Sequence, residues 1–141
     1  MPQAFKYLTS ALFAAVVVQF VLAGYGSFYA LDKADGATVT KGSIDHGFKA
    51  HAVVGTVLLV VMLLLVIVAA AGRLGPTALK FSVGLLVAGI LQMVFAALGR
   101  NVPALGFLHV VNALAIYAAA GLLAHRAWTR GMQPSPPTTA A

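Results

Sequence analysis

The feature that most constrains this chain is a set of four long stretches without a single Asp, Glu, Lys or Arg. They are 19 to 25 residues long and comprise Tyr7–Leu31, Ala50–Gly72, Phe81–Gly99 and Asn101–His125. Because an α-helix rises about 1.5 Å per residue, each stretch can cross a hydrocarbon core about 30 Å thick. Irregular backbone would leave unpaired amide groups in lipid. The sequence therefore predicts an all-α membrane protein whose four transmembrane helices span about residues 7–30, 47–72, 79–99 and 104–126.

Composition supports this class of protein and excludes several others. Hydrophobic residues make up 61% of the 141 residues and charged residues only 9%, against about 25% charged in a typical soluble domain. The net charge of +6 comes from basic residues that stand singly between apolar stretches, so no basic stripe follows a nucleic-acid backbone. With no cysteine, the chain has no disulfide, cysteine-ligated iron–sulfur cluster or catalytic thiolate. No nucleophile–base arrangement or phosphate loop appears, so independent catalysis is not expected.

The connections predict how the helices are ordered. The connections at residues 73–78 and 100–102 are short. Short connections make consecutive helices antiparallel neighbours. We therefore expect an up-down-up-down bundle over residues 1–131, followed by a disordered tail at 132–141. Pro103 is placed to open the fourth helix. Ser43 is expected to cap the second, which would begin near Asp45.

Orientation follows from the loops. With the N-terminus in the cytoplasm, five basic residues lie inside and four outside, and all three acidic residues lie outside. The positive-inside rule then favours cytoplasmic N- and C-termini in the inner (plasma) membrane of the cell. Trp128, beyond the fourth span, suits an interfacial anchor. The first span exceeds the apolar core of a secretory signal and is expected to be retained.

A short pattern occurs twice at a fixed offset. Gln19, Val21, Ala23 and Gly26 recur 73 residues later as Gln92, Val94, Ala96 and Gly99. The next helix of each half carries a histidine and, four residues on, a small residue: His51 with Gly55, and His109 with Ala113. Chance is one explanation, since Val, Ala and Gly are common in apolar helices. Glutamine, however, occurs in the apolar spans only at these two positions, which favours a pseudo-two-fold internal repeat.

The histidines give the strongest functional signal. Polar groups in a membrane usually face the bundle interior, and the second and fourth helices are diagonal partners in the expected bundle. His51 and His109, at about the same depth, would then face each other across the core. Two opposed imidazoles are the axial ligands of a non-covalently bound haem b. Gln19, Gln92, Asn112 and Gly55 would complete the cofactor-binding site. Arg100, with Lys49 and Tyr25, would meet the haem propionates.

Two other interpretations of these residues stay open. The histidines can hydrogen-bond to each other, to the glutamines or to water, and serve packing alone. The chain would then be a non-catalytic accessory subunit of a larger membrane complex, without a cofactor. A small transporter has less support, because no carboxylate lies within a span. His46 and His125 are expected to be interfacial residues.

The chain also resembles known membrane proteins. Residues 51–55 (HAVVG) and 107–114 (FLHVVNAL), with Gln19 and Gln92 upstream, resemble an uncharacterised family of small four-helix bacterial membrane proteins over about residues 5–128. The same order of features is similar to one four-helix half of haem A synthase, in which paired histidines hold haem. Ala52 stands where that family commonly has arginine, and its upstream glutamate, its cysteine pair and its second half are missing. The resemblance implies haem binding but not synthase activity. The expectation of electron transfer with a quinol or a larger respiratory complex comes from the diagonal pair of His51 and His109.

Overall fold

The computed structural model describes residues 2–36 and 38–129, and this part of the chain is helical apart from turns and one isolated bridge between Asp35 and Thr38. Four of its helices are long and apolar enough to cross a membrane, and a fifth is short. They are α1 (Pro2–Asp32), α2 (Lys41–Gly47), α3 (Lys49–Ala71), α4 (Pro76–Gly99) and α5 (Pro103–Thr129). The chain is thus an all-helical, multi-pass membrane protein. The tail predicted to be disordered lies outside the described residues.

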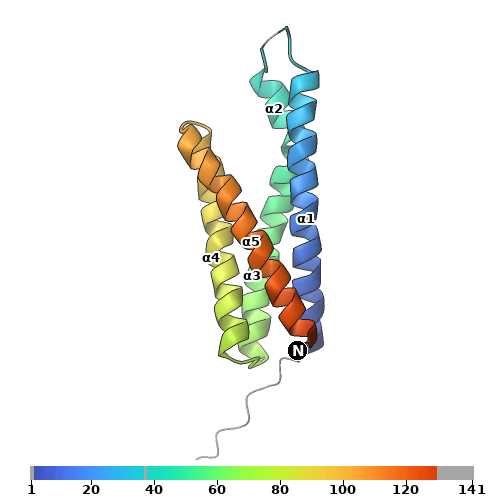
Figure 1. Ribbon diagram of the computed structural model, residues 1–141, viewed down its shortest axis with the longest axis vertical. Helices are drawn as coiled ribbons and strands as arrows, with labels where there is room; N and C mark the ends of the chain where they lie inside the picture. The colour runs from blue at the N-terminus through green and yellow to red at the C-terminus, as the bar shows by residue number, and fades with distance from the viewer. Residues whose placement is uncertain (1, 37, 130–141) are drawn as a thin grey trace, which may run out of the picture.

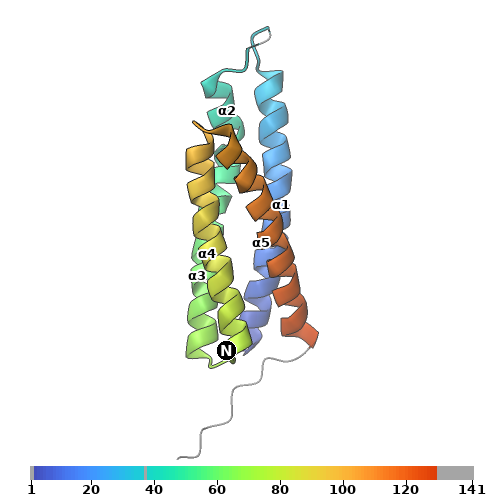
Figure 2. The same ribbon diagram turned by 60° about the vertical axis from the view of Figure 1, so that its left-hand side comes forward.

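The four long helices form a ring of contacts. Helix α1 packs against α3 and α5, and α4 packs against the same two helices. No close backbone approach joins α1 with α4 or α3 with α5 within the described residues, so these pairs are diagonal. Figures 1 and 2 show the N-terminus and the end of α5 at one end of the bundle, called here the terminal end. The α1–α2 loop and the α4–α5 turn lie at the other, called the loop end.

Local sequence explains where most helices begin. Pro76 and Pro103 occupy the first positions of α4 and α5, where a missing N–H costs nothing. Gly75, just before α4, has φ of +89°, a conformation that favours glycine. The start at Pro103 confirms the sequence prediction, whereas Pro76 lies in the segment predicted to be a connection.

The expected cap of the second span is wrong. Thr40, in extended backbone, accepts a 3.1 Å hydrogen bond from the Ser43 backbone N–H and so caps a separate short helix, α2. The Ser43 hydroxyl instead donates to the Thr40 carbonyl oxygen at 2.8 Å. Phe48 then interrupts the helix, and α3 begins at Lys49. His51 therefore lies in the first turn of α3 rather than two turns into a helix that begins near Asp45.

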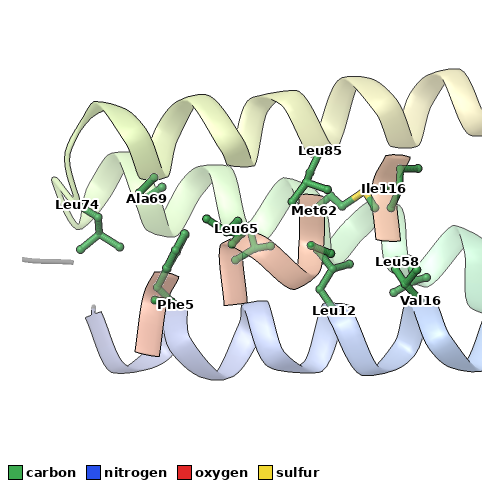
Figure 3. Close-up of a cluster of buried hydrophobic side chains, with 14 residues drawn as sticks. Phe5, Leu12, Val16, Leu58, Met62, Leu65, Ala69, Leu74, Leu85 and Ile116 are labelled. Atoms are coloured by element: carbon green, nitrogen blue, oxygen red, sulfur yellow. The ribbon is translucent and has the colours of Figure 1, made fainter. Parts of the chain in front are cut away.

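The tightly packed core occupies the terminal half of the bundle. Its largest fully buried hydrophobic side chains are Phe5, Leu12, Leu65, Leu85 and Leu123, several of which Figure 3 shows meeting between the helices. No residue is buried in the segments 17–25, 48–57 and 90–115, which contain both histidines and both span glutamines. In Figure 1 the upper ends of α4 and α5 lean away from α1. The bundle is therefore closed by side chains at one end and loosely packed at the level of the histidines.

Buried positions correspond between the two helix pairs. Four buried residues of α1 and four of α4 are separated by 73 residues: Phe5 and Ala78, Thr9 and Ser82, Leu12 and Leu85, Val16 and Gly89. Four of α3 and four of α5 are separated by 58: Leu58 and Ile116, Met62 and Ala120, Leu65 and Leu123, Ala69 and Ala127. The α1–α3 pair and the α4–α5 pair thus bury corresponding faces, and the two offsets differ because the first connection is longer.

Candidate functional site

Each span glutamine is joined to one histidine by two hydrogen bonds in opposite directions. Gln19 donates from Nε2 to the His51 backbone oxygen at 3.1 Å, and His51 Nδ1 lies 3.2 Å from the Gln19 backbone oxygen. Gln92 donates to the His109 backbone oxygen at 2.9 Å, and His109 Nδ1 lies 3.0 Å from the Gln92 backbone oxygen. These bonds tie α1 to α3 and α4 to α5 at the same level and in the same way.

The hydrogen bonds fix the tautomer of both rings. A backbone carbonyl oxygen can only accept, so the Nδ1 atoms of His51 and His109 must carry the proton and donate. In a neutral imidazole the other nitrogen, Nε2, then keeps its lone pair. Neither Nε2 has a protein hydrogen-bond partner among the described residues. Both histidines thus present an Nε2 lone pair on a ring whose orientation is held by a hydrogen bond to the neighbouring helix.

The two rings lie close together across the bundle. The ring centres of His51 and His109 are 6.3 Å apart, with their planes inclined by 59°. Both side chains are half-buried. Since α3 and α5 are diagonal helices with no close backbone approach, these side chains reach toward each other over the loosely packed level of the bundle.

The two halves of the site differ at one position. Asn112 donates from Nδ2 to Gln92 Oε1 at 2.6 Å and to the Ala88 backbone oxygen at 2.8 Å. The residue 58 positions earlier is Val54, which has no donor. Gln19 Oε1 is accordingly buried without a hydrogen-bond partner in the described part of the chain. Both side-chain polar atoms of Gln92 are thus hydrogen-bonded, whereas Gln19 Oε1 lacks a donor.

The remaining predicted site residues lie as follows. A Cβ on Gly55 would come 2.9 Å from Gln19 Nε2, so this glycine leaves room for the glutamine side chain. Arg100, at the end of α4, is exposed, as are Lys49 and Tyr25. Asn112 bonds to α4. The structure thus groups the two histidines, the two glutamines, Asn112 and Gly55, and places Arg100 at the surface of the loop end.

The other two histidines lie apart from this group. His46 is exposed and stacks on Tyr29 with ring centres 5.0 Å apart. His125 is exposed near the end of α5. Sequence reasoning missed that the partner of each imidazole is the glutamine's backbone oxygen rather than its side chain. The difference between Val54 and Asn112 was visible at the repeat offset and could have indicated the unequal halves.

The protein supplies few ligands for a metal at this level. Within residues 2–36 and 38–129, no group of three or more His, Cys, Asp or Glu side chains is placed to hold a metal ion. Two imidazoles alone match a metal whose other ligands come with it, as the four pyrrole nitrogens of a haem do. Comparisons of the chain with protein-family models, with curated proteins and with solved structures find no match.

Exchanging the unequal residues tests the hydrogen bonds of the two halves. Asn112→Val leaves Gln92 Oε1 without its donor, as Gln19 Oε1 is now, and is expected to lower the unfolding free energy by about 0.5–2 kcal/mol. Val54→Asn supplies the missing donor and is expected to raise it. Thermal unfolding in detergent measures both changes, and the double exchange is the matched control. Opposite changes in the unfolding free energy of the two single variants are the expected result. An unchanged unfolding free energy for Asn112→Val would contradict the stabilising role of its hydrogen bond to Gln92 Oε1.

Proposed function

We propose that this chain binds one haem b through Nε2 of His51 and Nε2 of His109 and serves as an electron-transfer or redox subunit of a membrane. The observation that carries the proposal is the pair of oriented imidazoles with ring centres 6.3 Å apart. Two metal–imidazole bonds of about 2.0–2.1 Å, with each ring centre about 1.1 Å beyond its nitrogen, require a separation of about 6 Å.

Two further features of the site fit a bound macrocycle. Ligating histidines usually donate their second ring N–H to a carboxylate or backbone carbonyl, which fixes the ring and raises its basicity. His51 and His109 each have such a carbonyl partner. The absence of buried residues in segments 17–25, 48–57 and 90–115 leaves this level without a packed core. Because the terminal half of the bundle is closely packed, a cofactor between the helices at the level of His51 and His109 would complete the core.

The proposed haem would supply reversible one-electron chemistry, and the residues around it would hold it in place and tune its reduction potential. With His51 and His109 both as ligands, the group would suit electron transfer rather than the binding of a substrate to the metal. Gln92, held by Asn112, keeps His109 in place through its carbonyl oxygen. Arg100 and Lys49, exposed toward the loop end, are the cations available to haem propionates. A quinol or a larger respiratory complex in the same bilayer is the expected redox partner.

The proposal includes a topology and an origin for the site. The ring of contacts and the short connections support an up-down-up-down bundle. The matching buried positions and the two matching glutamine–histidine pairs support a pseudo-two-fold repeat of a helix hairpin. Such a repeat brings one ligand from each half to a shared axis.

We also assign an orientation, with both termini in the cytoplasm and the membrane the inner (plasma) membrane. The terminal end of the bundle holds the start of α1, the α3–α4 turn, the start of α4 and the end of α5. By these bounds it carries four basic residues, Lys6, Arg73, Lys80 and Arg126, as the positive-inside rule favours for the cytoplasmic side. Trp128 at this end donates to the Ser10 hydroxyl at 2.8 Å and lies under the Lys6 ammonium. Such a contact suits an aromatic anchor at the membrane surface.

Absorption spectroscopy of the purified full chain tests the function. The protein, expressed with sufficient haem supply and purified in mild detergent, is expected to show a Soret band and the sharp α-band of a six-coordinate b-type haem after reduction. A pyridine haemochromogen assay should give about one haem per chain. Colourless protein that takes up no added haemin would contradict the proposal and favour the alternative, an accessory subunit whose histidines serve only packing.

A further inference from the structure

A second feature of the bundle lies on its surface, away from the histidines. A groove of about 340 Å³ between α4 and α5 is lined by Lys80, Phe81, Gly84, Leu85, Ala88, Ala115 and Ala119. Apart from Lys80 these residues are apolar, and four of them are glycine or alanine. From Lys80 to Ala88 the groove follows about two turns of α4, or about 12 Å. It is long and apolar enough to hold a segment of a hydrocarbon chain.

One end of the groove carries positive charge. Lys80 lines it, and the Arg126 guanidinium lies 4.9 Å from the centre of the Phe81 ring, which is also part of the wall. The three acidic residues of the chain, Asp32, Asp35 and Asp45, belong to the loop end. The ion pair between Lys33 and Asp32 also lies there. Acidic side chains therefore do not neutralise the cations at this end, which lies level with the first turn of α4 and the last turns of α5.

The α1–α3 pair carries different residues at the positions that correspond to this groove. At the same offsets, Val57 and Val61 stand where the groove has Ala115 and Ala119, and Tyr7 and Val68 stand where it has Lys80 and Arg126. The α1–α3 pair thus has valines in place of the two alanines and no cation at the positions of Lys80 and Arg126. The α4–α5 pair has both the groove and positive charge at its terminal end.

We propose that this groove is a binding site for a phospholipid with an anionic headgroup. One acyl chain would lie along Gly84, Ala88, Ala115 and Ala119, and the phosphate would meet Lys80 and Arg126. Charge complementarity favours the anionic headgroup, because each Lys or Arg near a membrane surface adds to the electrostatic attraction of anionic lipids, and Lys and Arg add about equally. Small side chains allow the close approach that gives the acyl chain its packing contacts. The site is independent of the histidines and of the proposed function.

Native mass spectrometry of the full chain tests this site. Protein delipidated in mild detergent is titrated with dioleoyl phosphatidylglycerol and, separately, with dioleoyl phosphatidylcholine. The wild type is expected to retain one phosphatidylglycerol with a clear preference over phosphatidylcholine. Replacing both cations, Lys80→Gln with Arg126→Gln, should weaken phosphatidylglycerol binding about thirtyfold and abolish the preference.

The acyl-chain half of the site has a matched control within the chain. Ala115→Val with Ala119→Val introduces the residues of the other helix pair and should weaken both lipids. The reverse exchange, Val57→Ala with Val61→Ala, lies outside the groove and should leave binding unchanged. Thermal unfolding without added lipid checks that each variant is folded. Unchanged phosphatidylglycerol binding in the Lys80 and Arg126 variant would overturn the proposal. Displacement of the lipid by inorganic phosphate alone would do the same, since it would show an anion site that needs no acyl chain.

Discussion

His109→Ala is expected to abolish the haem spectrum of the purified protein, and His51→Ala is expected to do nearly the same. Each substitution removes one of the two proposed haem ligands and also breaks a hydrogen bond to the adjacent helix. Loss of a residue that merely orients a ligand commonly weakens metal binding by about 10–100-fold, and loss of a ligand should exceed that range. The haem content after purification, measured by pyridine haemochromogen, should fall at least tenfold for both variants.

The other two histidines provide matched controls for this experiment. His46 stacks on Tyr29 and His125 lies near the terminal end, so His46→Ala and His125→Ala should keep the wild-type haem content. If the four alanine variants lose haem equally, the loss reflects general instability and not ligation. If none loses haem, the assignment of His51 and His109 is wrong.

Exchange of the ligand type separates ligation from structure. Methionine is also an axial ligand, and His/Met ligation raises the reduction potential relative to two histidines. His51→Met is therefore expected to retain part of the haem with a more positive midpoint potential. A histidine with only a packing role would give no such shift. The measurement is a spectroscopic redox titration of the variant against the wild type.

The sequence carried much of the architecture because the bilayer restricts the possible structures. Charge-free stretches such as Tyr7–Leu31 must be helices in lipid, and the structure has a helix over each of the four. Pro103 located the start of α5, whereas α4 begins at Pro76, in the segment predicted to be a connection. Another exception was the second span. Thr40, not Ser43, caps the separate short helix α2, and α3 begins at Lys49 without a side-chain cap. Both residues are good caps, and only the path of the preceding loop decides between them.

The site was predictable in its residue types but not in its contacts. The 73-residue offset singled out Gln19 and Gln92, and the histidines followed in the next helix of each half. The sequence could not show that each imidazole bonds to a backbone oxygen, because every residue carries one and helix rotation selects which is used. The role of Gly55 was hidden for a similar reason. A Cβ at this position would lie only 2.9 Å from Gln19 Nε2, so the glycine leaves room for the glutamine side chain.

Glycine contacts at the loop end lead to the second prediction with a large expected effect. In the α4–α5 pair, a Cβ on Gly99 would come 2.6 Å from the Cα of Gly106. Where α1 packs against α2, a Cβ on Gly26 would come 2.9 Å from the Gly47 backbone oxygen. Both contacts are with backbone, which cannot move aside as a flexible side chain can. Small residues permit this kind of close helix approach in membranes.

Gly99→Val is therefore expected to force α4 and α5 apart at the loop end, and Gly26→Val is expected to force α1 and α2 apart there. Overpacking typically costs about 1–3 kcal/mol, and here the backbone contact places the expected loss at the upper end of that range. Unfolding of the purified protein in detergent, followed by circular dichroism, measures it. Gly24→Val is the control, because a Cβ at Gly24 meets nothing within 4 Å. A similar stability for all three variants would show that glycine contacts do not set the spacing of the helices.

The same variants connect this spacing to the histidines. Gly99 lies two turns from Gln92 on α4, so separating α4 from α5 should lengthen the 3.0 Å contact between His109 Nδ1 and the Gln92 backbone oxygen. The imidazole would then lose its fixed orientation, and haem affinity should fall even in protein that remains folded. Gly99→Val is expected to lower haem occupancy at a temperature where its helix content equals that of Gly24→Val. Unchanged occupancy under those conditions would mean that the His109 ring is held by something other than the packing of α4 against α5.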